Sequence, residues 1–537
     1  MREISTEVLV VGGGLGGVAA ALAAARNGKQ VVLTEETTWL GGQLTSQAVP
    51  PDEHPWIEQF GCSESYRRLR EGIRDYYRRW YPLHPVARQR RALNPGAGLV
   101  SKLCAEPRAG VAAIEGMLAP SRAAGRLDVR YRVRPVAAET DGDRVTSVTL
   151  EHLDSKERFV AHADFIIDAT ELGDLLPLTG TEHVTGFESQ AETGEPSAPA
   201  EAQPLNMQAV SWCFVVDHRA GEDHTIDRPD DYDHWRDFRP DYWPGRMLGL
   251  TAPNPQTLEP HHHDFVPNQD DDPLAISADQ RKNPGSKDLW RFRRLLARGM
   301  FVEGTFDSDI VLVNWPMIDY VEGPVIGVSD DEAAKHLDGA RRQSRAMMYW
   351  LQTEAPRPDG GTGWPGLRYR PDVAGTDDGL AMAPYIREGR RIRARTTVVE
   401  QDLSLAVRGD AGAVAYPDTV GVGMYRIDLH PSTGGDNFID VGSNPYQIPL
   451  GALIPVRMTN LLAGAKNIGT THITNGSYRL HPTEWSVGEV AGLLAAHCLD
   501  IDATPEQVHA DAAQLQSFQE RCESEGIERD WPDVRGY

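Results

Sequence analysis

The hydrophobic positions near the start of the chain predict a strand, a helix and a second strand in close succession. Residues 8–11 form an apolar run without a polar break, which is typical of a buried parallel strand. Residues 18–25 are rich in alanine, the best helix former, and Gly28 follows them as part of a C-terminal cap. Residues 31–33 are a second apolar run, and Glu35 stands at its end. The chain is therefore expected to open with a βαβ unit.

Further along, the pattern predicts a helical segment and then a group of strands. Residues 50–125 read as helices joined by loops. Within them, apolar residues recur at helical spacing between 66 and 91, which predicts an amphipathic helix whose arginines face solvent. Alternation over 127–136 and 145–150 predicts strands, and the apolar run 165–170 predicts a buried strand.

The pattern changes after residue 184. Residues 185–205 are rich in Glu, Ala and Pro without periodicity, so we expect a linker or exposed loop. Residues 217–290 are a long, acidic and aromatic-rich irregular stretch, and loops of that length are usually functional or mobile. Residues 332–353 predict a clear helix.

The chain closes on a second strand–loop–helix unit. Residues 461–465 read as a buried strand, 467–476 as a loop and 485–497 as a helix. We expect an α/β fold with a discontinuous nucleotide-binding domain and an inserted α+β substrate domain. The expected boundaries are 1–184 and 446–500 for the first domain, 185–445 for the substrate domain and 501–537 for a tail.

Glycines at the start of the first predicted helix indicate a dinucleotide site. Gly12, Gly14 and Gly17 fill a G-x-G-x-x-G pattern, which allows a tight turn, close approach of a pyrophosphate and close helix packing. The helix N-terminus offers N–H groups to phosphates, and Glu35 is placed to bind ribose hydroxyls. A second match within 361–366 follows no strand and is interrupted by a proline, so it predicts only a loop.

Composition narrows the classes of protein and partner. The 537 residues predict two or more domains, and the 40% apolar and 25% charged residues are ordinary for a globular protein. No window approaches twenty apolar residues and the first strand begins near residue 8, so we expect no membrane span and no signal peptide. The five scattered cysteines favour reduced thiols in the cytoplasm, and the net charge of −24 makes nucleic acid an unexpected partner. The oligomeric state stays open, a homo-oligomer included.

Three adjacent histidines, His261, His262 and His263, precede Asp264. Neighbouring histidines do not easily converge on one ion, and no second cluster is spaced to complete a site. We therefore expect no metal centre.

Several short stretches resemble one protein family. They are similar to stretches of FAD-dependent oxidoreductases of the glutathione-reductase-like superfamily. Some of them look like one bacterial branch of that superfamily, which is often labelled only "FAD-dependent oxidoreductase". Near the middle of the chain, Gly389 stands where that branch usually has serine. The matching stretches are Leu40-Gly41-Gly42, Asn94-Pro95-Gly96, Leu103-Cys104-Ala105-Glu106-Pro107, 165–174, 384–392 and 461–492.

The resemblance implies FAD as the cofactor and a glutathione-reductase-like Rossmann fold. It also implies that the N-terminus of the last predicted helix stabilises negative charge on reduced flavin. Together with the glycine motif, it gives the expected cofactor-binding residues as Gly12, Gly14, Gly17, Glu35, Glu36, Gly41, Gly42, Gln43, Val133, Ala169, Thr170, Gly173, Asp174, Gly464, Asn467, Glu484 and Gly488.

The implied reaction is oxidation of a C–H/C–O or C–H/C–N bond of a small organic substrate by hydride transfer to flavin N5. A base with a pKa near the working pH suggests a histidine, and the candidates are His430, His472 and His481, with Arg479 to hold an anionic group or the flavin. Each histidine is equally well explained as a structural hydrogen-bonder. The expected substrate-binding residues are Asn314, Trp315, Tyr320, Arg387 and Tyr425.

Three alternatives remain open from the sequence. The first is a flavin monooxygenase or reductase, in which NAD(P)H reduces the flavin. Some flavin monooxygenases lack a second nucleotide motif, so its absence here does not rule this alternative out. The second is a plain NAD-dependent dehydrogenase, and a colourless purified protein would favour it. A non-catalytic or RNA-modifying flavin-binding protein is disfavoured by the acidic composition.

Overall fold

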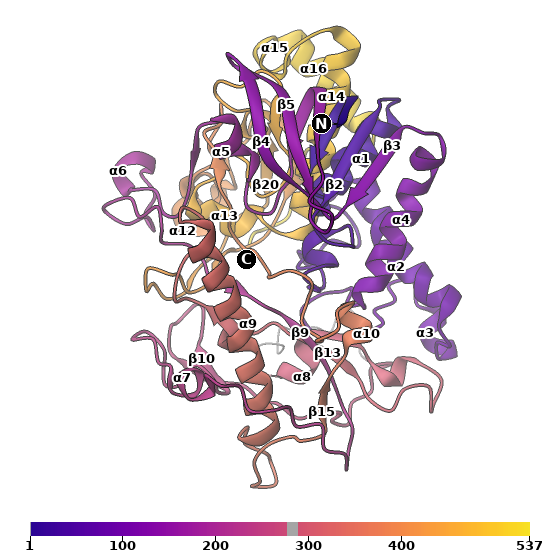
Figure 1. The fold of residues 1–537 in the computed structure, drawn as a ribbon, viewed down its shortest axis with the longest axis vertical. Coiled ribbons are helices and arrows are strands. Elements are labelled where there is room, and N and C mark those ends of the chain that lie inside the picture. The colour runs from indigo at the N-terminus through magenta and orange to yellow at the C-terminus, as the bar shows by residue number, and fades with distance from the viewer. Residues whose placement is uncertain (1, 276–287) are drawn as a thin grey trace.

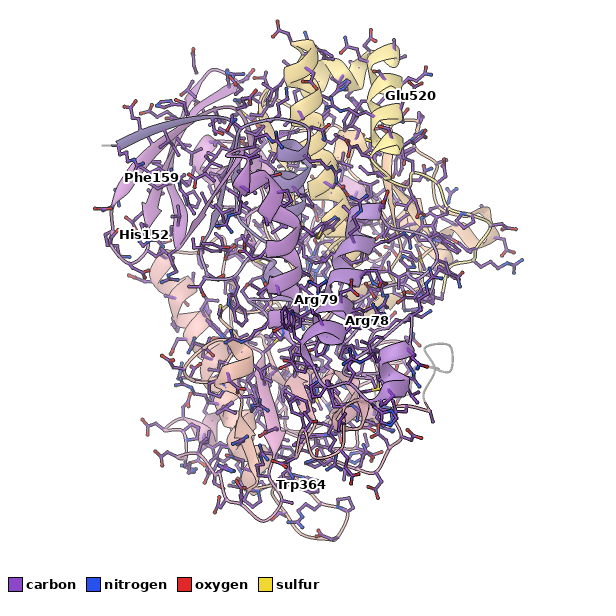
Figure 2. All side chains as sticks on the ribbon, turned by 90° about the vertical axis from the view of Figure 1, so that its right-hand side faces the viewer. Arg78, Arg79, His152, Phe159, Trp364 and Glu520 are labelled. Atoms are coloured by element: carbon purple, nitrogen blue, oxygen red, sulfur yellow. The ribbon has the colours of Figure 1, made fainter. Side chains whose placement is uncertain are left out.

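The computed structural model describes residues 2–275 and 288–537 as an elongated molecule with a sheet in each half (Figure 1). The sheet in the upper half of Figure 1 is largely parallel, and the sheet in the lower half is antiparallel. His152 and Phe159 lie on the upper sheet, and Trp364 lies toward the opposite end (Figure 2).

The parallel sheet has β1 at its centre and the strand order β3-β2-β1-β6-β5-β4, with β21 also pairing with β6. Strands β1, β2, β3, β6 and β21 run parallel, whereas β4 and β5 form an antiparallel extension. Its strands are β1 Arg2–Val11, β2 Val31–Glu35, β3 Leu127–Tyr131, β4 Val133–Asp141, β5 Arg144–His152, β6 Arg158–Asp168 and β21 Leu461–Ala463. The predicted α/β class with a Rossmann-like sheet is confirmed, and the domain boundaries stay a prediction.

The two ends of the chain are joined by close packing of α1 (Leu15–Arg26) on α14 (His481–Ile501). A Cβ on Gly488 would lie 1.9 Å from the carbonyl oxygen of Gly16, and one on Gly492 would lie 2.1 Å from that of Ala20. Only glycine therefore allows the two helices to approach this closely. This contact explains why a segment near residue 488 shares a core with the first βαβ unit.

Two predicted strands differ in extent from those observed. The alternating stretch 127–136 is divided between β3 and β4 at Arg132, whose φ of 60° turns the chain. The apolar run 165–170 is the second half of β6, whose first half pairs with β5 while its second half pairs with β21. Strand β6 thus pairs with both β5 and β21 along one of its edges.

The helical segment contains α2 (Glu64–Trp80), α3 (Pro85–Gln89) and α4 (Pro107–Ala123). The prediction that the arginines of the amphipathic helix face solvent is wrong for Arg70 and Arg74, which are buried and pair with Glu58. Trp80, predicted on the apolar face, is 68% exposed. The acidic segment before α2 supplies buried partners for these guanidinium groups, which the spacing of apolar residues did not reveal.

The antiparallel sheet has the strand order β12-β13-β9-β15. The long helix α9 (Asp330–Thr353) packs in the same half of the molecule (Figure 1), and the Ser329 hydroxyl caps it by accepting from the Glu332 N–H. A second hydrophobic core here is rich in tryptophan and methionine. The strands of the sheet are β9 Phe214–His218, β12 Arg294–Leu296, β13 Ile310–Val313 and β15 Leu367–Tyr369.

The remaining elements are short. The helices are α5 Leu175–Thr179, α6 Gln190–Thr193, α7 Tyr232–Asp237, α8 Leu289–Phe292, α10 Pro371–Ala374, α11 Glu400–Leu403, α12 Leu405–Arg408, α13 His472–Tyr478, α15 Pro505–Ala510 and α16 Ala512–Ser524. The strands are β7 His183–Val184, β8 Val210–Ser211, β10 Thr251–Pro253, β11 Pro260–His262, β14 Asp319–Tyr320, β16 Arg391–Ile392, β17 Thr419–Gly423, β18 Ile427–Leu429, β19 Ile439–Val441 and β20 Tyr446–Pro449.

The expected exposed loop 185–205 and the expected loop 467–476 meet each other in the structure. Helix α13 begins inside the second of them, and its first turn binds carboxylates from the first. Glu188 accepts from the His472 N–H at 2.9 Å, and Glu195 accepts from the Thr471 hydroxyl at 2.6 Å. Both glutamates are buried, so the prediction of an exposed segment is wrong there.

Within the described ranges, every helix is too short or too polar to cross a lipid bilayer.

Candidate active site

A first cavity of about 190 Å³ lies where β1, β2 and β6 end. The carboxyl ends of parallel strands are the usual ligand site of open α/β sheets. Of the residues expected to bind the cofactor, the ones that line this cavity are Gly12, Gly14, Glu35, Glu36, Gly42, Val133, Ala169, Thr170 and Asp174.

The three glycines of the motif have different surroundings. Gly12 has a φ of 100°, and a Cβ there would lie 2.2 Å from the carbonyl oxygen of Ala169. A Cβ on Gly17 would lie 1.8 Å from the carbonyl oxygen of Gly12. Gly14 is different, because its nearest neighbour would be the flexible end of Glu171 at 3.0 Å. Gly12 and Gly17 thus shape the turn, whereas Gly14 faces the cavity.

Charged side chains surround the start of α1. Gly14 is its N-cap and provides no side-chain cap for the first N–H groups of the helix. The Glu484 carboxylate accepts from the Gly16 N–H at 3.3 Å. The buried Lys466 ammonium pairs with Glu171 and lies 3.8 Å from Glu484. Burial alone would lower the pKa of Lys466, but these two carboxylates raise it, so the amine stays charged.

The far end of the cavity is acidic. Glu35 accepts from the Gly13 N–H at 3.0 Å and from the Thr37 N–H at 2.7 Å, so its carboxylate also holds the turn together. Glu36 follows β2, is exposed and lines the same cavity. The carboxylates of Glu35 and Glu36 can accept hydrogen bonds from sugar hydroxyls.

The other expected cofactor-binding residues do not line this cavity. Asn467 donates to the Asp168 carbonyl at 3.0 Å, and the Gln43 amide donates to the Arg479 carbonyl at 3.1 Å and to Glu484. The glycines in this group allow close packing or turns: Gly17, Gly41, Gly173, Gly464 and Gly488.

A second cavity, of about 550 Å³, lies beyond a wall formed by residues 383–387. From Pro384 onward, successive residues of this wall alternate between the two cavities. Ala383, Pro384 and Ile386 line the first cavity, whereas Tyr385 and Arg387 line the second. Four of the five expected substrate-binding residues line the second cavity, namely Asn314, Trp315, Arg387 and Tyr425.

The second cavity contains an oriented histidine. Nδ1 of His430 lies 2.5 Å from the buried Asp319 carboxylate, and Nε2 lies 4.0 Å from Asp428. Burial alone would raise the pKa of Asp319, but Arg387 and His430 hold it below its ordinary value, so this carboxylate is an acceptor. Nδ1 therefore carries the hydrogen in the neutral ring, and Nε2 is left free to accept a proton.

Arg479 also lines the second cavity. Its guanidinium donates to the Tyr385 hydroxyl and to the Asp428 carbonyl, each at 3.0 Å. These bonds fix the arginine on the cavity wall beside the tyrosine that separates the two cavities.

Three other candidate residues do not line the second cavity, namely His472, Tyr320 and His481. The His472 ring stacks on Phe187 with centroids 3.6 Å apart, and its Nδ1 lies 3.0 Å from Glu388. Burial raises the pKa of Glu388, yet His472 and Arg391 bring it down to about 2. Tyr320 lies in the second hydrophobic core with its hydroxyl bonded to His336 at 2.8 Å.

His481 has both ring nitrogens occupied by backbone groups. Nδ1 accepts from the Asp52 N–H at 3.2 Å, and Nε2 donates to the Val49 carbonyl at 3.1 Å. Burial lowers its pKa from 6.5 to about 4, so the ring is neutral and holds residues 49–52 in place. It therefore acts in our account as a structural group rather than as the base.

We predict that His481 makes the protein acid-sensitive. Because its folded pKa is depressed, the stability from the neutral ring is fully present above pH 6.5 and is lost as the pH falls to about 4. The loss is roughly 3 kcal/mol, since a tenfold change in proton affinity is worth about 1.4 kcal/mol. Denaturant unfolding at several pH values should show a weaker dependence in His481→Gln, and an unchanged dependence would contradict the assignment.

The three adjacent histidines lie beside β11, and the His261 and His263 rings contact each other edge-on, with centroids 4.8 Å apart. In the part of the chain that the structure describes, no group of three or more His, Cys, Asp or Glu side chains is arranged to hold a metal ion.

The parallel sheet with a glycine turn at its carboxyl edge is that of a dinucleotide-binding α/β protein. A model of the family described as FAD dependent oxidoreductase matches residues 7–520. The chain belongs to this family: it is an FAD-dependent oxidoreductase, and its cofactor is FAD. None of the curated proteins matches the chain.

The chain is also similar to solved flavoprotein structures. A geranylgeranyl bacteriochlorophyll reductase-like protein from Thermoplasma acidophilum is 10% identical over 98% of this chain and 85% of its own, with a TM-score of 0.32. Glycerol-3-phosphate dehydrogenase from Bacillus halodurans, solved with FAD, is 13% identical over 40% of each chain, with a TM-score of 0.24. The myxobacterial chondrochloren halogenase CndH is 17% identical, and the match covers 40% of this chain but only 44% of the halogenase, with a TM-score of 0.22.

The residues of the first cavity fit FAD. The cavity face of Gly14 at the start of α1 suits a diphosphate, with Lys466 nearby as a cation. Glu35 and Glu36 suit the ribose of the adenosine. When bound, FAD supplies the two-electron chemistry of this family.

Sequence analysis missed several residues of both sites. Lys466 stands one residue before the expected loop, and no local pattern distinguishes it from a surface lysine. Asp319 lies next to an expected residue, but its partner His430 is 111 positions away. Arg293 follows a short helix beyond the irregular stretch. The only sequence signal for these residues was a buried strand followed by polar residues. This signal indicates the region of a site but does not show which side chains belong to it.

Proposed function

We propose that the protein oxidises a C–H/C–O or C–H/C–N bond of a small organic substrate held in the second cavity. The observation that carries the proposal is the pairing of His430 with the buried Asp319 at the edge of that cavity. A histidine held by a carboxylate in one tautomer is the usual arrangement of a general base. Residues 383–387 contribute to the lining of both cavities, so the second cavity adjoins the first there.

Bound FAD would supply the two-electron acceptor for the substrate carbon, and Nε2 of His430 would take the proton of the neighbouring hydroxyl or amine. Asp319 stabilises the resulting imidazolium through Nδ1. Arg387 in turn bonds Asp319 at 3.0 Å and keeps it ionised, which makes Arg387 a positioning residue as well as part of the cavity wall. Carbon is oxidised by two electrons, and FAD is reduced by two.

The proposal is tested by mixing the FAD-loaded protein anaerobically with a panel of alcohols and amines. At least one compound is expected to bleach the yellow flavin and to yield one equivalent of carbonyl or imine per FAD. Reduction that requires NAD(P)H, with an oxygenated product in air, would support a monooxygenase and contradict the proposal.

A further inference from the structure

The second cavity has an excess of hydrogen-bond donors. Among the described residues that line it, the buried side-chain atoms without a hydrogen-bond partner are all nitrogens. They are Nε of Arg293, Arg387 and Arg479, Nδ2 of Asn314, Nε1 of Trp315 and Nε2 of His261. Buried N–H groups without acceptors are costly, so a ligand that fits this cavity supplies acceptor oxygens.

Arg293 is the least satisfied of the cavity arginines. Its two contacts with Asp52 are 3.4 and 3.5 Å long, beyond the usual range for an N–H···O bond. Arg426, by contrast, is in close contact with Asp440. Arg479 makes bonds of 3.0 Å. The Arg293 side chain is 12% exposed, and Asp52 raises its pKa and keeps it charged. Because both contacts with Asp52 are long, a shorter bidentate pair with an incoming anion would hold this guanidinium more tightly than Asp52 does.

Apolar surface accompanies these donors. Phe292, Trp315, Tyr385, Tyr425 and Phe438 line the same cavity. Aromatic walls bind the organic part of a ligand, while the few polar groups fix its orientation. The combination disfavours a small inorganic anion and favours an organic molecule that carries a carboxylate.

We infer that the substrate is an organic carboxylate whose carboxylate group pairs with Arg293. This inference rests on the proposed function and specifies its substrate class. Asn314 and Trp315 add N–H donors on the same cavity wall. Arg293 and the proton acceptor His430 line the same cavity, so one ligand can reach both. The carbonyl oxygens of the flavin itself are the other source of acceptors for these donors, and the test below separates the two.

The test compares benzoate with benzamide, which has the same size but no charge. Binding to the FAD-loaded protein is measured by equilibrium dialysis, which needs no turnover. Benzoate is expected to bind about 10- to 100-fold more tightly than benzamide, the range given by a charge-assisted hydrogen bond. Equal binding of the two probes would overturn the inference and would mean that the flavin satisfies the donors.

Substitutions at Arg293 test whether this residue causes the preference for benzoate over benzamide. Arg293→Gln is expected to abolish the preference for benzoate, and Arg293→Lys to keep part of it, because lysine retains the charge without the bidentate fork. Arg291→Gln is the matched control, because Arg291 lies two residues away, pairs with Asp288 and is not part of the cavity lining. A preference that survives in Arg293→Gln with normal FAD content would also overturn the inference.

The result is independent of the proposed reaction. Benzoate binding that depends on Arg293 would uphold the anion site even if no organic compound reduced the flavin. Conversely, reduction by a neutral alcohol, with benzoate bound no better than benzamide, would uphold the reaction and remove the carboxylate assignment.

Discussion

Replacing His430 with glutamine is expected to slow reduction of FAD by the organic substrate by about 10²- to 10⁴-fold, the usual contribution of a general base. Glutamine keeps a polar side chain on the cavity wall but cannot take up the substrate proton at Nε2. Stopped-flow absorbance of the yellow flavin under anaerobic conditions measures this rate directly. A rate within twofold of the original protein would contradict the assignment.

Two further variants separate proton transfer from a general disturbance of the cavity. His263→Gln is the matched control, since His263 lines the same cavity and has no part in the proposed proton transfer or anion binding. It should leave the rate nearly unchanged. Asp319→Asn removes the charge that holds His430 and should both lower the rate and move the rise of the pH–rate profile to lower pH. A merely structural Asp319 would lower the amount of folded protein without moving the profile.

Gly14→Val is expected to give a folded protein that contains no FAD. Gly14 has an extended backbone with φ of −62° and ψ of −173°, which valine adopts readily. Its Cβ would meet only the flexible ends of Glu171 and Glu484, and its side chain would enter the cavity proposed to bind the diphosphate. The purified variant should be colourless and should still unfold cooperatively.

Gly17→Val is the contrasting substitution in the same motif. A Cβ there would lie 1.8 Å from a backbone carbonyl oxygen, so this variant is expected to fail to fold rather than only to lose FAD. Gly116→Ala, on the open side of α4, should change neither property, because nothing lies within 4 Å of its added Cβ. Circular dichroism and the amount of FAD released on denaturation measure the two properties separately. Stoichiometric FAD in Gly14→Val would contradict the placement of the cofactor.

Local sequence was sufficient for the nucleotide half of the molecule. The apolar run of β1, the glycine turn and the alanine-rich α1 are neighbours in sequence, so their periodicity and their chemistry are read together. The resemblance gave Gly488 as an expected cofactor-binding residue, but the sequence did not reveal its close approach to Gly16, because this contact joins opposite ends of the chain. Family motifs thus supplied long-range information that single-sequence patterns lack.

The second cavity could be predicted only in part. Asn314, Trp315 and Tyr425 line the second cavity as expected, whereas Tyr320 lies in the second hydrophobic core. The carboxylate partner of a histidine is set by tertiary packing, not by spacing, so the sequence could not separate His430 from other histidines. Buried arginines were read as solvated for the same reason, since their partners come from distant segments.

The central claim is that the organic substrate, rather than a nicotinamide nucleotide, delivers the hydride. The most direct test is to mix the FAD-loaded protein anaerobically with NADPH and to follow the yellow absorbance of oxidised flavin. The account predicts that the band persists with NADPH and disappears once a suitable organic substrate is added. Rapid bleaching by NADPH alone would contradict the account and would identify the protein as a monooxygenase or reductase.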